Sequence, residues 1–488
     1  MSEPTSQSRG DAPDAGSRAE RGLIRQLMHR DHTRGNLLAS ILVLSAPAIV
    51  SSACMAAFQL VDLRFLGQLS GEAVAAAGAT TQTFRQAFQV VAFGLSVAIQ
   101  MLVAFRVGRG RMDEAAQTAG QSFLLAGALA LLAIGTVGLF PRFFVSLIVH
   151  ENAVPMAETY ARIIFLFFGF NVFTQISNGV LLGSGDATTP MLIGFAQIPV
   201  AIFFEWALAF GKLGLPELGV AGIAYGTVLG GATSFSIAMW ALFSGRCRVH
   251  LRGRHLRPDW PAVRRLAGTA WQPALQMIAR SLLVMVFMVL AGRLGSHVQA
   301  AYTIGLRIEV ISVMVAFPIA NACATLVGQN LGAGDRGRAW RAVWAAAGIG
   351  TAILGPAAVA LFFFRETAVG IFTSDPLVGG EAADYLRYVS FVLGFWGVYF
   401  VAFRTLQAAG DMVTPMVISI VLALGVGAPL AIVLSSRPEF GASGMWIANV
   451  VYSALNTLLM VGWLLTGRWT RRMSGAEASV SADAGADR

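Results

Sequence analysis

The sequence predicts an all-α integral membrane protein, with twelve transmembrane helices arranged as two pseudo-symmetric lobes of six helices each. Three observations support this prediction: the composition, a series of twelve apolar segments and an internal repeat. Of the 488 residues, 56% are hydrophobic and only 12% are charged, and the mean hydropathy is +0.66. Soluble globular proteins carry about 25% charged residues. The composition therefore excludes a soluble globular protein.

Twelve apolar segments follow one another between residues 36 and 467. Each has close to, or more than, the ~20 residues that a helix needs to cross the hydrocarbon core. The segments cover roughly residues 36–66, 75–105, 118–140, 157–183, 188–210, 218–244, 266–292, 298–330, 342–364, 383–408, 413–436 and 441–466.

The two halves of the chain repeat one another at a spacing of about 225 residues. Asp186 in LLGSGDATTP corresponds to Asp411 in LQAAGDMVTP, and Gly108 corresponds to Gly332. Because each half has an even number of spans, both halves enter the membrane from the same side. An axis along the membrane normal should therefore relate them, with the ligand site between the two lobes.

Positive charges are distributed unevenly among the predicted loops. If the N-terminus is cytoplasmic, the cytoplasmic segments hold 23 Lys and Arg residues and the opposite loops hold five. This asymmetry follows the positive-inside rule and predicts that both termini are cytoplasmic. The formal net charge of +9 is thereby explained by topology and does not indicate a nucleic-acid partner.

The same features predict the division of the chain. Residues 1–35 are expected to form a disordered cytoplasmic tail, because they are polar and lack the apolar core of a signal peptide. Residues 36–245 form the N-lobe, and the basic stretch 246–265 forms a cytoplasmic linker. Residues 266–467 form the C-lobe, and 468–488 form a second cytoplasmic tail.

No cofactor, structural metal or nucleotide is predicted. The three cysteines are not spaced as pairs, and the six histidines fall in loops or tails. The glycine-containing stretches GRGRMDEA and GAGDRGRA lack the lysine of a phosphate-binding loop, so ATP is not expected to drive this protein.

Several motifs together resemble the multidrug and toxic compound extrusion (MATE) family, which belongs with the polysaccharide and lipid-precursor flippases. They are Pro47 followed by VDLRFLGQLSGEAVAAAG, FRVGRGRMDEA, LLGSGDATTP, GKLGLPELGVAGIAYGT, RLGSHVQAAYTIGLRIE, ATLVGQNLGAGDRGRA and LQAAGDMVTP. The resemblance covers nearly the whole membrane region. It implies a V-shaped, two-lobed bundle that exports organic compounds in exchange for H⁺ or Na⁺.

Asp62 is the first candidate for cation coupling, because an ionisable group near the bilayer centre costs roughly 2.5–3.5 kcal/mol and is functional by default. It matches the carboxylate of the family motif in the first span. Gln59 precedes it by three residues and shares its helical face. Such a carboxylate exchanges H⁺ or holds a desolvated Na⁺. The alternative is a structural pair with Arg64 at the outer end of the helix.

Glu205 is the second candidate for cation coupling. It lies in FFEWALAFGKLG, where one branch of the resembling family carries Asp and another carries Asn. With Asp62 it would form a two-carboxylate site inside the N-lobe, able to take one proton or neutralise one cation. The alternative is a solitary buried Glu that is hydrogen-bonded to a neighbouring helix.

The C-lobe departs from the family pattern. Counting from Pro273, the acidic positions of the NorM-type branch fall on Ser281 and near Trp396, and neither residue is acidic. The departure argues against an Na⁺ site in the C-lobe and favours coupling in the N-lobe.

Glu309 is the third acid within the spans, and subtracting the repeat offset of 224 leads to Arg85. Charges at pseudo-equivalent places could meet across the midline, and we hypothesise a gate pair. The alternative is that each charge is paired locally for helix packing.

Other polar residues within the spans allow two interpretations. Some could line a cavity, although such residues also join helices by hydrogen bonds. The candidates for cavity lining are Gln59, Asn171, Gln175, Asn178 and Gln276. The arginines within the spans are expected to reach the interface or to be paired internally. They are Arg162, Arg280, Arg387 and Arg404.

The sequence thus predicts a monomeric secondary antiporter of a bacterial inner membrane, which works by alternating access. Its substrates would be drug-like, amphipathic and cationic, and its only ligands besides lipid would be these compounds and the coupling ion. Pro47 would be the hinge, because it removes a hydrogen bond from the helix that carries Asp62. The alternative from the same superfamily is a flippase for lipid-linked oligosaccharide or peptidoglycan precursors.

Overall fold

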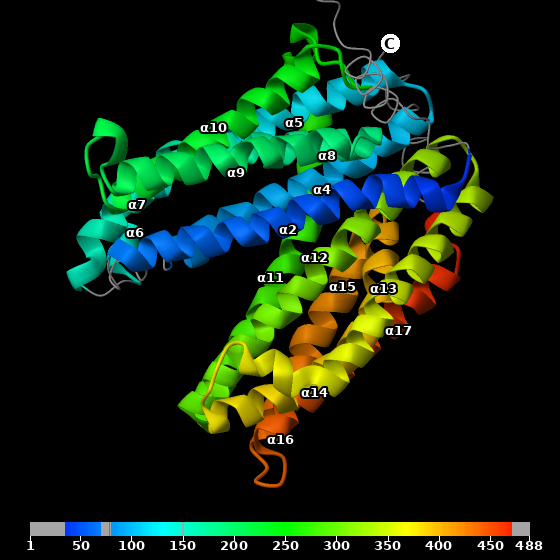
Figure 1. Cartoon of the computed structure of the whole chain (residues 1–488). Helices are drawn as coiled ribbons and strands as arrows, with labels where there is room; N and C mark the ends of the chain where they lie inside the picture. The colour runs from blue at the N-terminus through cyan, green and yellow to red at the C-terminus, as the bar shows by residue number, and fades with distance from the viewer. Residues whose placement is uncertain (1–34, 70–77, 79, 149–150, 471–488) are drawn as a thin grey trace, which may run out of the picture.

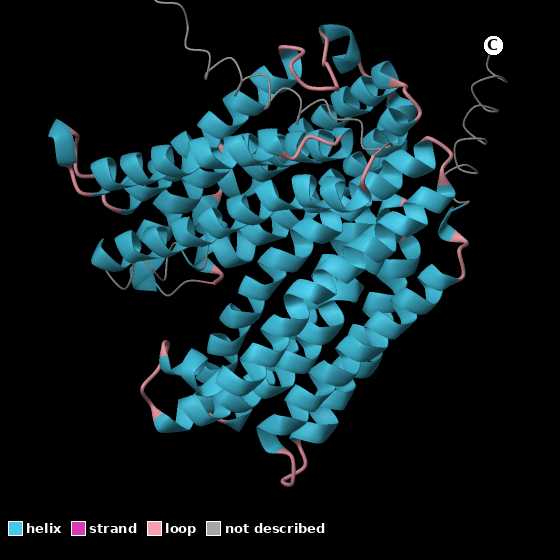
Figure 2. Ribbon diagram, turned by 45° about the vertical axis from the view of Figure 1, so that its right-hand side comes forward, coloured by secondary structure: helices cyan, strands magenta, loops and turns pink. Residues whose placement is uncertain are grey.

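The computed structural model describes residues 35–69, 78, 80–148 and 151–470, and throughout these ranges the regular structure is helical (Figure 2). The predicted tails lie almost wholly outside them. The N-lobe contains α2 (Leu37–Leu69), α4 (Gln86–Gly108), α5 (Met112–Ala133), α6 (Pro141–Ser146), α7 (Val154–Leu166), α8 (Phe168–Ser184), α9 (Thr188–Ala209) and α10 (Val220–Phe243). The C-lobe contains α11 (Trp260–Leu294), α12 (Ser296–Gly332), α13 (Arg336–Gly370), α14 (Pro376–Ala408), α15 (Val413–Leu422), α16 (Ala428–Ser435) and α17 (Gly441–Leu465).

The two lobes form the arms of a V (Figure 1). The arms meet at the end where α2 begins and diverge toward the end where α6 and α16 lie. Three short π-helical segments interrupt or extend the α-helices, at Thr80–Arg85, Ile134–Gly138 and Ala423–Gly427. The all-α, two-lobed fold predicted from the sequence is confirmed.

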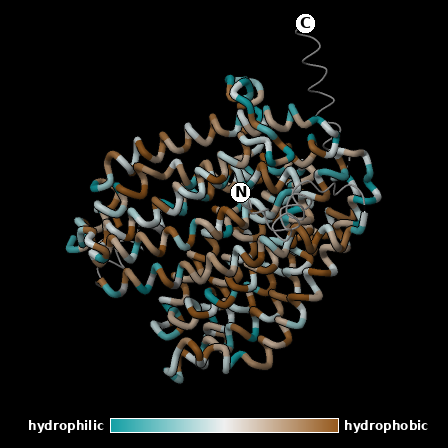
Figure 3. The backbone as a smooth tube through the Cα atoms, turned by 45° about the horizontal axis from the view of Figure 1, so that its top comes forward, coloured by the Kyte–Doolittle hydropathy of each residue, from teal (hydrophilic) through white to brown (hydrophobic). Residues whose placement is uncertain are grey.

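Within the described residues, 11 helices are long and apolar enough to cross a membrane, and the total becomes 12 if one bent pair is a single span. The bent pair is Glu151–Leu166 with Phe168–Ser184, which meet at 47°. It occupies the segment predicted at 157–183. Apolar residues run along the helices, whereas hydrophilic residues gather in the connections at their ends (Figure 3). Large apolar side chains such as Leu131 and Phe363 are exposed on the surface, as expected for contact with lipid tails.

The lobes touch where α4 crosses α12, and the contact follows the internal repeat. A methyl group added to Gly108 would lie 2.0 Å from the carbonyl oxygen of Gln329. A methyl group added to Gly332 would lie 2.1 Å from the carbonyl oxygen of Phe105. The repeat offset of 224 relates Gly108 to Gly332 and Phe105 to Gln329, so the two contacts are the same contact seen from each lobe. The crossing therefore lies on the pseudo-twofold axis, and only glycine allows the backbones to approach this closely.

The most obvious repeated motif forms a helix corner in each lobe. Gly185 and Gly410 have φ angles of 91° and 82°, which end α8 and α14 in the left-handed conformation that glycine favours. The next residue accepts hydrogen bonds from the start of the following helix: Asp186 from the backbone of Thr189 at 2.9 Å, and Asp411 from that of Thr414 at 3.3 Å. The repeated sequence therefore encodes a helix end followed by a helix start.

The basic segment between the lobes is packed onto the N-lobe. Val249 and Leu251 are buried in the same apolar core as the N-lobe helices. The side-chain amide of Gln121 donates to the carbonyl oxygens of His255 and Arg257 at 3.0 and 2.8 Å. Helix α11 begins at Trp260, six residues before the predicted start of the seventh span. Residues 246–259 are therefore part of the N-lobe structure.

Candidate functional site

The N-lobe site is formed by two carboxylates from helices that pack together. Asp62 lies on α2 and Glu205 on α9, and these helices are in contact. Glu205 is fully buried, and Asp62 is close enough to act on it electrostatically. Asp62 Oδ1 and Glu205 Oε2 are both buried without a hydrogen-bond partner among the described residues. The structure therefore brings the two predicted coupling acids into one site.

Two further residues complete this site. Thr227 on α10 donates its hydroxyl to Glu205 Oε1 at 2.9 Å. The neighbouring residue, Gly226, allows α10 to pack closely against α9, because a methyl group at Gly226 would lie 2.4 Å from the backbone nitrogen of Glu205. Arg85, at the end of the first π-helical segment, is the positive charge that acts on both acids. The alternative pairing of Asp62 with Arg64 is not seen, since Arg64 is exposed and does not act on Asp62.

The donor set is suited to a small cation. Two carboxylates and a threonine hydroxyl provide hard oxygen ligands of the kind that bind alkali cations, and either carboxylate can instead accept H⁺. One oxygen on each acid has no hydrogen-bond partner among the described residues, so its lone pairs are available for such a bond. One nearby arginine offsets only part of the negative charge, so one further positive charge would neutralise the cluster.

Three of the predicted cavity residues share one face of α8. Asn171, Gln175 and Asn178 are all half-buried, at spacings of four and three residues. The side chain of Asn171 accepts from Gln89 on α4 at 3.5 Å, and Asn178 Oδ1 is buried without a partner among the described residues. Their role in substrate contact stays a prediction.

The other predicted residues lie apart from this face. Gln59 is exposed on α2, one turn before Asp62. Pro47 lies inside α2, which continues unbroken on both sides of it. Gln276 is buried in the C-lobe, where its amide donates to Ser419 at 2.9 Å. Gln276 therefore serves in a hydrogen-bond network and does not line the C-lobe pocket described below.

Glu309 is paired within its own lobe. Its Oε2 accepts from the hydroxyl of Tyr385 at 2.7 Å, and its Oε1 lies 3.7 Å from the guanidinium of Arg280. Gly305, one turn earlier on α12, makes room for the ring of Tyr385. Arg85 lies beside the N-lobe acids instead. The hypothesised gate pair of Glu309 with Arg85 is therefore not formed in this structure, and the alternative of local pairing is the one observed.

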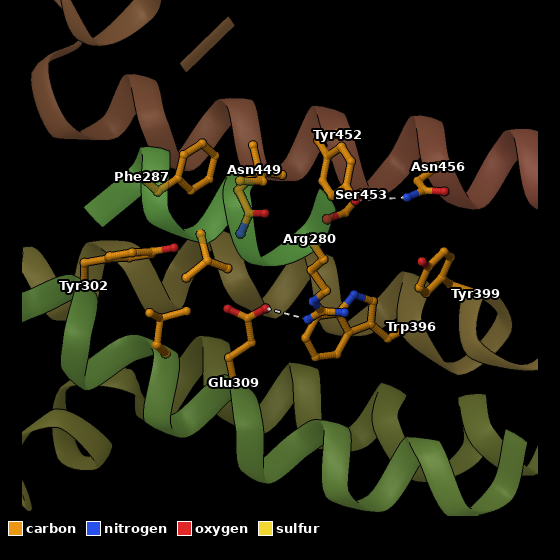
Figure 4. Close-up of a pocket in the computed structure, with 13 residues that line it drawn as sticks. Arg280, Phe287, Tyr302, Glu309, Trp396, Tyr399, Asn449, Tyr452, Ser453 and Asn456 are labelled. Carbon is orange, nitrogen blue, oxygen red and sulfur yellow. Dashed lines mark hydrogen bonds and ion pairs between the residues drawn. The ribbon is translucent and has the colours of Figure 1, made fainter. Parts of the chain in front are cut away.

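Arg280 and Glu309 line a pocket inside the C-lobe, between α11, α12, α14 and α17 (Figure 4). Arg280 follows the turn of α11 that contains Pro273 and directly precedes Ser281. Its guanidinium lies over the ring of Trp396, 5.4 Å from the centroid. An arginine beside Ser281 and the aromatic ring of Trp396 thus stand where the family pattern has acids. The rest of the wall combines polar and apolar side chains: Leu283, Val284, Phe287, Tyr302, Leu306, Tyr399, Asn449, Tyr452, Ser453 and Asn456.

A third polar cluster joins the lobes. Arg404 on α14 is 2% exposed and donates to Gln100 on α4 of the N-lobe at 2.5 Å. It also donates to the side chains of Asn321 at 2.8 Å and Gln407 at 2.6 Å. Gln100 in turn donates to Thr325 on α12 at 3.1 Å. The predicted internal pairing of Arg404 is thus with neutral amides, and one of them belongs to the other lobe.

The sequence did not single out Thr227 or Tyr385, and it did not place Arg280 in the C-lobe pocket beside Glu309. Thr227 and Tyr385 are uncharged residues in apolar segments, and their positions relative to the acids depend on how distant helices pack. The one available signal was Arg280 itself, an arginine beside a position where the family pattern has an acid.

Two bundles of six spans related by an internal repeat, with carboxylates buried between helices, define a membrane transporter. The MatE family model matches residues 47–207 and 273–433, once in each lobe at the spacing of the internal repeat. The chain belongs to the MatE family, the transporters that its sequence motifs resemble.

Relatives and structural neighbours agree with this assignment. The chain is 26% identical to a probable multidrug resistance protein NorM of Thermotoga maritima, over 88% of this chain and 93% of that protein. It shares its fold with a MOP superfamily transporter of Pyrococcus furiosus, with a TM-score of 0.82 and 22% identity over 92% of this chain and 98% of the other. That structure was reported as having a binding pocket of reverse polarity that suggests a different function. An outward-facing MATE family transporter is similar to the same degree, with a TM-score of 0.81, 22% identity and coverage of 92% and 98%.

Proposed function

We propose that the protein is a secondary active antiporter that exports amphipathic organic compounds carrying a positive charge in exchange for H⁺ or Na⁺. The observation that carries this proposal is the pair Asp62 and Glu205, each with a buried oxygen that has no hydrogen-bond partner within the part of the chain that the structure describes. Buried, incompletely satisfied carboxylates are costly within a membrane, and coupling to a cation is a function that would retain them. The relatives named as probable multidrug resistance proteins support the choice of substrate.

In this proposal the coupling ion and the substrate alternate. An H⁺ or Na⁺ entering from the outside binds Asp62 and Glu205 and reduces the negative charge in the N-lobe. A cationic substrate loses its electrostatic attraction to the lobe and is released. Moving one charge through 100 mV provides about 2.3 kcal/mol, before any concentration gradient is counted.

Pro47 is the proposed hinge. A proline within a helix removes one backbone hydrogen bond and allows bending at that turn. Pro47 lies fifteen residues before Asp62 on the same helix. A change of charge at Asp62 can therefore cause α2 to bend at Pro47. We propose that this bend changes the shape of the N-lobe as the ion binds.

The remaining features of the proposal follow from the class of protein. The chain would act as a monomer in a bacterial inner membrane, with both ends in the cytoplasm and without ATP. The charge asymmetry of the loops supports this orientation.

The test is efflux of a cationic dye from proteoliposomes under an imposed H⁺ or Na⁺ gradient. Wild type is compared with Asp62→Asn and Glu205→Gln, and Asp384→Asn, at an exposed position of α14, serves as the matched control. We expect gradient-driven efflux to be lost in the first two variants and kept in the control. The gradient that drives wild type identifies the coupling ion. Absence of dye movement by wild type under both gradients would reject drug export and favour the lipid-precursor flippase.

A further inference from the structure

Arg280 is a charged side chain in the C-lobe with unused hydrogen-bonding capacity. Its guanidinium has five N–H donors. Among the described residues it forms no hydrogen bond, and the nearest carboxylate oxygen, on Glu309, is 3.7 Å away. Its side chain is 39% exposed, and the ring of Trp396 lies beneath it. The guanidinium is therefore a planar donor fork that lines the pocket and has N–H groups without an acceptor among the described residues.

Glu309 has one carboxylate oxygen, Oε1, that can accept a further hydrogen bond. Tyr385 satisfies Oε2 at 2.7 Å, whereas Oε1 has only the longer ion pair with Arg280. A distance of 3.7 Å exceeds that of a hydrogen bond. The two side chains are thus close enough to form an ion pair but too far apart to form a hydrogen bond with each other.

The pocket between these charges is small. Its volume is about 50 Å³, whereas a cavity that binds benzene has a volume of about 150 Å³. This space holds the head group of a compound and not the body of a drug-sized molecule. Figure 4 shows Arg280 and Glu309 facing each other, with Asn449 beside them and the rings of Trp396, Tyr399 and Tyr452 around them.

We propose that this pocket binds the zwitterionic head group of an aromatic substrate. The carboxylate of the substrate is held by the fork of Arg280, and its ammonium group donates to Glu309 Oε1. The aromatic body, which the pocket volume does not hold, extends out of the pocket past the rings that line it. This inference rests on the proposed transport function and deepens it by naming a class of substrate.

The charges of the pocket favour a zwitterion over either simple ion. A plain cation is repelled by Arg280, the more exposed charge, and a plain anion is repelled by Glu309. A zwitterion satisfies both groups while the net charge of the pocket remains zero. Like-charge repulsion therefore makes this C-lobe pocket specific for zwitterions, whereas a substrate with a single positive charge is attracted by the N-lobe acids.

Binding of three compounds with one aromatic body tests the proposal. They are 3-(2-naphthyl)alanine, a zwitterion; 3-(2-naphthyl)propionate, an anion; and 2-(2-naphthyl)ethylamine, a cation. Equilibrium dialysis against the purified full-length protein in detergent measures the affinity for each. We expect the zwitterion to bind about tenfold more tightly than either single-charged compound, since each loses one charge-assisted contact. Equal affinity for all three, or tightest binding of the amine, would overturn the proposal.

Variants identify the groups that bind. Arg280→Gln should weaken binding of the zwitterion about tenfold, and Arg280→Lys should weaken it less, because a lysine keeps the charge without the fork. Glu309→Gln should remove the preference for the zwitterion over the propionate. Arg293→Gln is the matched control, since Arg293 is exposed on the same helix and outside the pocket. If both Arg280 variants bind the zwitterion as wild type does, the assignment is wrong.

This experiment separates the inference from the transport proposal. Dialysis needs no ion gradient, so zwitterion binding that depends on Arg280 would support the pocket even if no gradient-driven efflux were found. Efflux of a cationic dye that is coupled through Asp62, together with no discrimination among the three naphthyl compounds, would support transport and overturn the pocket.

Discussion

Arg404 of the C-lobe donates a hydrogen bond to Gln100 of the N-lobe at 2.5 Å, and this bond joins the two arms of the V. Among the described residues no carboxylate accepts from Arg404, whose side-chain acceptors are the amide oxygens of Gln100, Asn321 and Gln407. These hydrogen bonds to neutral oxygens are weaker than an ion pair with a carboxylate would be. This arrangement fits the proposed alternating access, in which the contact between the lobes would open and close.

Replacing Arg404 with Met should loosen the contact between the lobes. The substitution keeps much of the volume and removes the donor from the amide oxygens of buried Gln100 and Gln407, each at a cost of about 1–3 kcal/mol, and from that of half-buried Asn321. Spin labels at exposed Arg111 and Arg336, in a cysteine-free background, should report longer and broader distances. Arg387→Met, at an exposed site on the same helix, is the control. Unchanged distances in Arg404→Met would show that backbone packing alone holds this end closed.

Gly108→Ala should separate the same end by steric means. Its new methyl group would lie 2.0 Å from a backbone oxygen, which cannot move aside as a side chain can. Overpacking of this kind costs about 1–3 kcal/mol. We expect a lower melting temperature in detergent and slower transport, and an equal effect from Gly332→Ala because of the repeat. Gly348→Ala is the control, since no atom lies within 4 Å of its added methyl group. Equal stability of Gly108→Ala and wild type would contradict the close crossing.

Cys247 should resist thiol reagents while the segment between the lobes stays packed. Burial, assisted by Asp186, raises the pKa of the Cys247 thiol to about 12 from 9.0. Maleimide reacts with the thiolate, and this rise in the pKa of Cys247 lowers the fraction of thiolate at neutral pH about a thousandfold compared with an ordinary thiol. In a Cys54→Ala, Cys323→Ala background, mass spectrometry should show no adduct at pH 7 and rapid labelling after denaturation. Fast labelling of the folded protein would mean that residues 246–259 detach from the N-lobe.

Asp186 should make stability depend on pH in a defined direction. Burial raises the pKa of the Asp186 carboxyl above its ordinary value. The folded protein therefore keeps this proton to a higher pH than the unfolded chain. This contribution to stability is complete below the unfolded pKa of about 3.9 and is lost as the pH rises through the folded pKa. Asp186→Asn, which keeps an oxygen for the helix start, should gain stability relative to wild type across that window.

Melting temperatures of wild type and Asp186→Asn from pH 4 to 8 measure this difference. Asp186→Ala removes the helix cap and serves for comparison. It should lower the stability of the folded protein by about 0.5–2 kcal/mol, because the backbone N–H groups of Thr188 and Thr189 lose their acceptor. A pH-independent difference between wild type and Asp186→Asn would contradict the raised pKa.

The sequence was sufficient for the elements that depend on local composition. Twelve apolar stretches, each long enough to cross a bilayer, must become helices, because no other open-ended structure satisfies its backbone in lipid. The spacing of Asp186 and Asp411 gave the internal repeat, and the structure explains it as the same helix corner in both lobes. Desolvation cost alone pointed to Asp62, Glu205 and Glu309 as residues that need an explanation.

Only the tertiary structure decided which charges meet. The symmetry argument placed Glu309 opposite Arg85, but a pseudo-twofold axis does not bring equivalent positions together unless they lie on it. Gly108 and Gly332 lie close to that axis and touch the opposite lobe, whereas Arg85 and Glu309 lie away from it and take partners within their own lobes. Glu309 is paired with Arg280 of α11 and Tyr385 of α14. The packing of these helices depends on side-chain shape along their whole lengths. That information is distributed over many residues, so no local pattern in the sequence could supply it.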